Sequence, residues 1–104
     1  MATATVNCNR QPQAVATTMT TGGTEYSIEI TDANCIRFKD RANAAVVRYA
    51  FIAGIVGTGT ASGVMTLPAG TTYQSPVDPN GGRRSFTLYV ASATAGMVLE
   101  AEVW

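Results

Sequence analysis

Apolar residues recur at every second position in several short runs of this chain, and this pattern limits the fold more than any other feature. Successive side chains of a β-strand point to opposite faces of the sheet, so a strand with one buried face shows this alternation. The clearest runs are TEYSIEI (24–30), CIRFKD (35–40), FTLYV (86–90) and MVLEAEVW (97–104). Helical spacing is scarce, and the sequence therefore predicts an all-β protein.

Turn-forming residues separate two pairs of these runs. Thr31 to Asn34 lie between the first pair, and SATAG (92–96) lies between the second, with Gly96 placed for a positive φ angle. Both pairs are predicted to form hairpins. The predicted inward-facing residues are Tyr26, Ile28, Ile30, Ile36, Phe38, Phe86, Leu88, Val90, Met97, Leu99, Ala101 and Val103.

The remaining strands are less distinct. VVRYAFI (46–52) is apolar on both faces, which is typical of a central strand or of one covered by a partner. VMTLPAGTTYQ (64–74) is predicted as a short strand that Pro68 breaks. The Thr-rich runs TATVNC (3–8) and AVATTMTT (14–21) are compatible with strands on β propensity.

Two glycine-rich segments complete the pattern. GIVGTGTASG (54–63) has no lysine and no phosphate-loop spacing, so a flexible exposed loop is predicted there, and DPNGG (78–82) is a turn. With about eight short strands, residues 1–104 are expected to form one antiparallel β-sandwich domain, for which a jelly-roll-like arrangement is one closure.

Composition excludes several classes of function. The chain has no histidine, its seven basic and seven acidic residues cancel, and only 13% of its residues are charged. General acid–base catalysis and metal binding by imidazole are therefore excluded, and nucleic acid is not an expected partner because the basic charge is missing. Without a base to activate a nucleophile, we predict no enzyme, no catalytic residues and no cofactor.

Acidic residues do not suggest a site either. Glu100 and Glu102 share one face of a predicted strand, where a solvated outer surface is the expected environment. Asp32, Asp40 and Asp78 fall at separate turn-like positions, so no metal site is predicted.

The sequence also bears on location and redox state. No run of apolar residues is long enough to cross a membrane, and the N-terminal MATATVNCNR lacks the pattern of a signal peptide. Synthesis in a cytoplasm is expected, and Cys8 and Cys35 are expected to be buried free thiols, although two cysteines allow one bridge.

Three residues are candidates for an interface. Arg83 and Arg84 form the only local basic pair, which fits either an acidic partner surface or the protection of a sheet edge. Trp104 shares its predicted face with Glu100 and Glu102, so it is expected to pack on a neighbouring chain or sheet edge, or else over the surface of its own domain. The tyrosines, which could stack on a sugar or a base, are expected to pack in the core or on sheet faces: Tyr26, Tyr49, Tyr73 and Tyr89.

The segment TLPAGTTYQSPVDPNGGRRSFTLYVASATAGMVLEAEVW (66–104) resembles the C-terminal part of small virion proteins of tailed bacteriophages, the capsid decoration (cement) or minor head proteins. The resemblance rests on the strand–turn–strand TLPAGTTY and on the closing LYVASATAGMVLEAEVW. It implies a structural role on the capsid surface, with the major capsid protein and copies of the chain itself as partners. The alternative hypothesis is an Ig-like or lectin-like module that recognises a carbohydrate or a cell surface.

Overall fold

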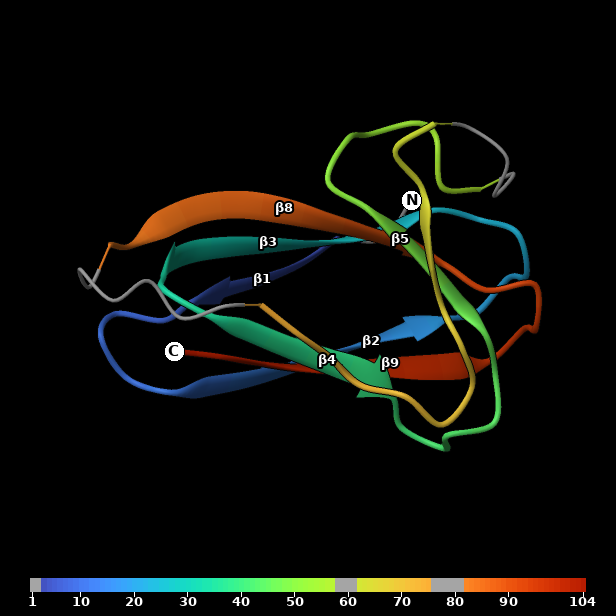
Figure 1. The fold of residues 1–104 in the computed structure, drawn as a ribbon, viewed down its shortest axis with the longest axis horizontal. Coiled ribbons are helices and arrows are strands. Elements are labelled where there is room, and N and C mark those ends of the chain that lie inside the picture. Colours follow the sequence, from blue (N-terminus) through green and yellow to red (C-terminus); the bar gives the residue numbers. More distant parts are fainter. Residues whose placement is uncertain (1–2, 58–61, 76–81) are drawn as a thin grey trace.

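The computed structural model describes residues 3–57, 62–75 and 82–104, which form two β-sheets packed face to face (Figure 1). These residues contain strands and connecting segments and no helix. The strands are β1 (Thr3–Asn7), β2 (Gln13–Met19), β3 (Tyr26–Ala33), β4 (Ile36–Asp40), β5 (Val47–Ala50), β6 (Met65–Leu67), β7 (Tyr73–Gln74), β8 (Arg84–Ala91) and β9 (Met97–Val103). The predicted all-β sandwich is confirmed, including strands in the two Thr-rich runs.

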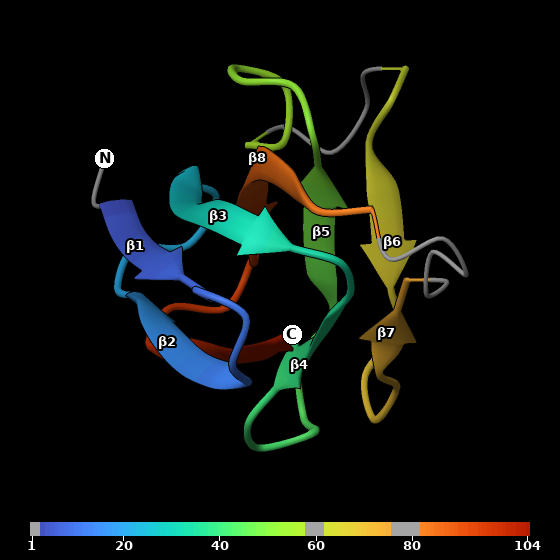
Figure 2. The same cartoon turned by 90° about the vertical axis from the view of Figure 1, so that its left-hand side faces the viewer.

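The pairing of the strands is nested. β5 pairs with β6, β4 with β7, β3 with β8 and β2 with β9, and all four pairs are antiparallel. This folds the chain as one long hairpin wound into two sheets, which is the arrangement of a jelly roll. The sheet orders are β1-β3-β8-β5-β6 and β2-β9-β4-β7, where β1 is an additional strand parallel to β3 (Figure 2).

Both predicted hairpins are wrong. β3 and β4 lie in different sheets, and so do β8 and β9. In each case the connecting turn carries the chain across the sandwich instead of back along the same sheet. The residue alternation is the same in both arrangements, because strands on opposite sides of a sandwich also point every second residue into one shared core. The predicted positive φ angle at Gly96 is confirmed at 81°.

The core lies between the sheets and consists of the residues that alternation placed inward. Most of them are fully buried, while Phe86 and Met97 are partly buried and pack against the others. Each large buried aliphatic side chain contributes about 1.5–3 kcal/mol to folding by leaving water. The same core also contains Cys8, Met19, Ala33, Val47, Tyr49 and Leu67.

The run 46–52 behaves as predicted for a central strand, since β5 lies between β8 and β6. The glycine-rich loop after it differs from the prediction in its first part. Val56 is fully buried against the outer face of the five-stranded sheet, beside Ala50 and Ala91. Arg48 holds this segment down by donating to the carbonyl oxygens of Val56 and Gly57 at 3.2 and 2.9 Å. Residues 58–61 of the loop lie outside the described residues.

Both cysteines are free and buried, as predicted. The thiol of Cys8 donates to the carbonyl oxygen of Gln11 at 2.7 Å, and that of Cys35 donates to the carbonyl oxygen of Ser75 at 3.2 Å. Each thiol therefore stabilises a connecting segment by a hydrogen bond.

Candidate functional site

An apolar hollow opens between the two sheets, where β4 and β7 of one sheet face the start of β8 in the other. We call it the aromatic pocket. Its volume is about 400 Å³, within the range of small ligand sites. It is lined by Asn34, Ile36, Phe51, Tyr73, Ser75, Arg84, Ser85 and Phe86.

Aromatic rings support the walls of this pocket. The rings of Phe51 and Phe86 meet edge to face with centroids 6.0 Å apart, and the ring of Tyr73 stacks on the buried ring of Phe38 at 4.8 Å. Tyr49 contacts both Tyr73 and Phe51, at 5.3 and 6.2 Å, and so joins the two groups. Burial raises the pKa of Tyr49, and the nearby Tyr73 adds to this effect. The pocket walls are therefore parts of one continuous aromatic cluster.

Three exposed apolar residues lie around the end of β5, and one of them, Phe51, lines the pocket. Phe51 is 49% exposed, Ile52 follows it at 62%, and Met65 at 57% lies opposite Tyr49 in the β5–β6 register. We call Phe51, Ile52 and Met65 the apolar rim. Large apolar side chains exposed together on a small protein indicate an interaction surface. Val46, a fourth exposed apolar residue, precedes β5 at its other end.

The structure separates the two neighbouring arginines. Arg83 donates from Nε to Oδ1 of Asp32 at 2.9 Å and from Nη2 to the sulfur of Cys8 at 3.3 Å. Asp32 is held for this contact by a bulge in β3, where its φ angle is +59°. The side chain of Arg84 is exposed, lines the aromatic pocket and forms no hydrogen bond or ion pair with another described residue. Of the pair, Arg84 is thus the residue available to a partner.

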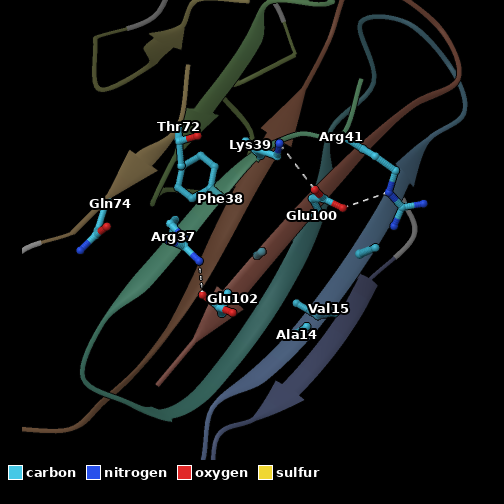
Figure 3. A pocket seen from close by; sticks show the side chains of 12 residues that line it. Ala14, Val15, Arg37, Phe38, Lys39, Arg41, Thr72, Gln74, Glu100 and Glu102 are labelled. Atoms are coloured by element: carbon cyan, nitrogen blue, oxygen red, sulfur yellow. Dashed lines mark hydrogen bonds and ion pairs between the residues drawn. The ribbon is translucent and has the colours of Figure 1, made fainter. Parts of the chain in front are cut away.

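A second, wider hollow of about 790 Å³ covers the outer face of the four-stranded sheet (Figure 3). Its centre is a ladder of ion pairs between β4 and β9. Arg37 pairs with Glu102, and Glu100 accepts from Arg41 at 3.0 Å and lies 4.0 Å from Lys39. Because these charges satisfy one another and are partly exposed, they stabilise the sheet face weakly and leave little net charge for a ligand. The solvated outer face predicted for Glu100 and Glu102 is confirmed.

Trp104 continues β9 beyond its last residue. Its backbone N–H donates to the carbonyl oxygen of Cys35 at 3.1 Å, and its carbonyl oxygen accepts from the N–H groups of Asn34 and Cys35. The side chain is partly buried and packs against the main core. The structure thus places Trp104 over its own domain, while a further contact with a neighbouring chain stays a prediction.

The other residues that the sequence singles out pack in or against the core, or hold a turn. Tyr26 and Tyr49 are buried, and Tyr73 and Tyr89 are partly buried. Asp40 ends β4 and accepts from the N–H groups of Ala44 and Ala45 at 2.9 and 3.0 Å, which fixes the following turn. Asp78 and most of the DPNGG turn lie outside the described residues.

Within residues 3–57, 62–75 and 82–104, no group of three acidic or cysteine side chains is placed to hold a metal ion. No helix in these ranges has the length and apolarity needed to cross a membrane.

Comparison with known proteins finds two solved structures with weak similarity to this chain. No protein-family model and no curated protein matches the sequence. A de novo designed double-stranded β-helix, solved by solution NMR, is similar with a TM-score of 0.48 and 8% identity, over 89% of this chain and 96% of the design. The pre-peptidase C-terminal domain of a collagenase from Bacillus anthracis is similar with a TM-score of 0.43 and 8% identity, over 96% of this chain and 91% of that domain.

Sequence reasoning missed the aromatic pocket because its residues come from four separate segments. Alternation places Ile36 and Tyr73 on strand faces and includes Phe51 in a strand. In the structure that strand, β5, ends one residue before Phe51, at Ala50. The sequence does contain one signal for this site. VVRYAFI ends in two neighbouring apolar residues, Phe51 and Ile52, and a strand with one buried face would leave one of them exposed.

Proposed function

We propose that the protein is a structural virion protein, of the capsid decoration or minor head type, that attaches to a protein shell through the aromatic pocket and the apolar rim. The observation that carries this proposal is the aromatic hollow together with the exposed apolar residues at the end of β5, where Phe51 lines the hollow, Ile52 follows Phe51 and Met65 lies opposite Tyr49. A pocket lined by aromatic side chains and flanked by an arginine has the composition of a binding hot spot.

Three further observations support a structural role. The segment 66–104 resembles phage virion proteins, as described above. Charged residues make up 13% of the chain, so little charge must lose its water when the surface is covered. The accessible surface is 5442 Å², and a standard interface of about 800 Å² per partner would cover a modest part of it. Such a protein would have the major capsid protein and its own copies as neighbours on the virion surface.

The proposal is tested on particles from the source of the protein. Particles are purified by density gradient, and mass spectrometry determines whether the chain remains with the shell. Shells freed of it are then mixed with purified wild-type protein or with the Phe51→Ala or Met65→Ala variants. We expect saturable binding of the wild type and weaker binding of both variants. A chain that is absent from particles and does not bind shells would contradict the proposal.

Carbohydrate recognition is the second candidate, and the pocket itself favours it. Sugar rings stack on exposed aromatic faces, and Phe51, Tyr73 and Phe86 offer such faces next to the polar groups of Ser75 and Arg84. Glycan-array binding that is lost in Phe51→Ala, together with no binding to shells, would favour this candidate over the first.

A further inference from the structure

We infer that the aromatic pocket receives a large apolar side chain from an extended segment of the partner protein, with a carboxylate beside it that pairs with Arg84. This inference rests on the proposed function and specifies the chemistry of the partner at the same site.

The shape of the pocket favours one large apolar side chain. Its floor includes Ile36, which is 2% exposed, and its walls include the rings of Phe51, Tyr73 and Phe86. A volume of about 400 Å³ is at the lower end for ligand sites, so it holds one large apolar side chain with parts of the neighbouring residues and is small for an extended sugar chain. Edge-to-face packing such as that between Phe51 and Phe86 leaves aromatic edges and faces available to a third ring.

The charge of the pocket indicates which group of the partner lies near the apolar side chain. The described residues that line it include one cation, Arg84, and no carboxylate. Asp32, the acidic residue that faces this part of β8, is already engaged by Arg83 at 2.9 Å. A guanidinium such as that of Arg84, which has no hydrogen-bond or ion-pair partner among the described residues, can bind a carboxylate in a planar, bidentate manner. An acidic residue two positions from the apolar anchor, on the same face of the extended segment, would therefore satisfy the arginine.

Polar groups around the pocket suit a peptide backbone. The hydroxyl group of Ser85 lies among the lining residues and can donate to or accept from the N–H and C=O groups of an extended segment. The hydroxyl of Ser75 is already engaged, because it accepts from the N–H of Ile36 at 3.0 Å and donates to the sulfur of Cys35 at 3.5 Å. An extended segment would direct every second side chain toward the pocket.

The inference is tested by NMR titration of the labelled protein with two peptides, acetyl-Ser-Phe-Ser-Glu-Ser-amide and acetyl-Ser-Phe-Ser-Gln-Ser-amide. We expect chemical-shift changes centred on Phe51, Tyr73, Arg84 and Phe86, with roughly threefold tighter binding of the Glu peptide from one exposed ion pair. Arg84→Gln should remove that difference, so that the two peptides bind the variant with equal affinity. The control Arg37→Gln removes a charge from the opposite sheet face and should change neither affinity.

Three results would overturn the inference. The first is equal affinity for both peptides in the wild type, and the second is a shift pattern away from the pocket. The third is stronger binding of glucuronic acid than of either peptide at the same residues, which would identify the occupant as an acidic sugar. Failure of the proposed function is distinguishable, because then shells would not bind the wild type. If shells bind wild type and Arg84→Gln equally, the attachment role stands and the carboxylate pairing is wrong.

Discussion

Arg83 and Asp32 form an ion pair that joins the start of β8 to the bulge of β3, with Nε of Arg83 2.9 Å from Oδ1 of Asp32. Arg84, the next residue, points its side chain to the aromatic pocket and has no such partner among the described residues. Two adjacent arginines thus have different environments, and they should respond differently to removal.

Replacing Arg83 by alanine should lower the free energy of unfolding by up to about 1 kcal/mol, because the ion pair is partly exposed and contributes modestly. Replacing Arg84 by alanine should leave stability unchanged and weaken binding to shells. Urea denaturation and a shell-binding assay measure the two effects separately. The reverse result, with Arg84→Ala the less stable protein, would contradict this division.

Trp104→Ala should lower the free energy of unfolding by about 2 kcal/mol. The side chain packs against the main core but stays partly exposed, so the loss should be smaller than the 3–5 kcal/mol of a fully buried Trp. Trp104→Phe should recover most of that stability. If Trp104 also contacts a neighbouring subunit, the alanine variant will lose more in shell binding than in unfolding. If Trp104→Ala binds shells as tightly as the wild type once its lower stability is taken into account, Trp104 acts only within its own domain.

The double variant Cys8→Ala, Cys35→Ala should fold and bind as the wild type does, with a loss of about 1 kcal/mol per site from packing and the thiol hydrogen bonds. Both cysteines are free and buried, so no bridge contributes to stability. Addition of a reducing agent should leave the Tm of the wild type unchanged. A disulfide found by non-reducing mass spectrometry, with a large fall in Tm on reduction, would refute this prediction.

Tyr49 should make the protein less stable in alkali. Burial raises the pKa of its hydroxyl, so the folded state holds that proton more tightly than the unfolded chain does. Stability is then complete below about pH 10 and falls as the pH rises above it. Tyr26 acts in the opposite sense, because its hydroxyl accepts a hydrogen bond from the backbone N–H of Thr21 and this lowers its pKa.

Tyr49→Phe keeps the ring and removes the titrating group, so its free energy of unfolding should fall less between pH 9 and about pH 11 than that of the wild type. Urea denaturation at a series of pH values measures the difference. Parallel curves for the two proteins would show that another group causes the alkaline loss.

Arg48→Ala should release the segment 54–57 from the outer face of the five-stranded sheet, because the two hydrogen bonds to Val56 and Gly57 are lost. Hydrogen exchange of the amides in this segment should become faster, while that of β3 and β8 stays slow. Arg41→Ala, which removes an ion pair on the other sheet, is the matched control and should leave this segment unchanged.

Alternation in the sequence predicts which way side chains face, and it does so accurately here. Leu88, Val90, Leu99 and Val103 are all fully buried, as their phase required. It does not identify the neighbouring strand, because Ile36 and Phe38 would face the same core whether β4 paired with β3 or crossed to the other sheet. Pairing is decided by contacts between distant segments, such as Ile36 with Val103, which no local pattern records.

The candidate site was predictable only in part. The pair Arg83 and Arg84 was visible in the sequence, but the bulge that directs Asp32 to Arg83 was not, and this bulge distinguishes the two arginines. The aromatic pocket depends on where β5 ends and on the crossing from β6 to β7, and both are set by packing between sheets.

The nested pairing has a consequence for biosynthesis. β9 lies between β2 and β4, and β8 lies between β3 and β5, so the central strand of each sheet follows its neighbours in the order of translation. Of the described strands, only β5 and β6 are both consecutive and paired. A nascent chain on the ribosome therefore exposes unpaired strand edges and apolar faces until residues 97–103 emerge, and during that interval it would depend on chaperones to avoid aggregation.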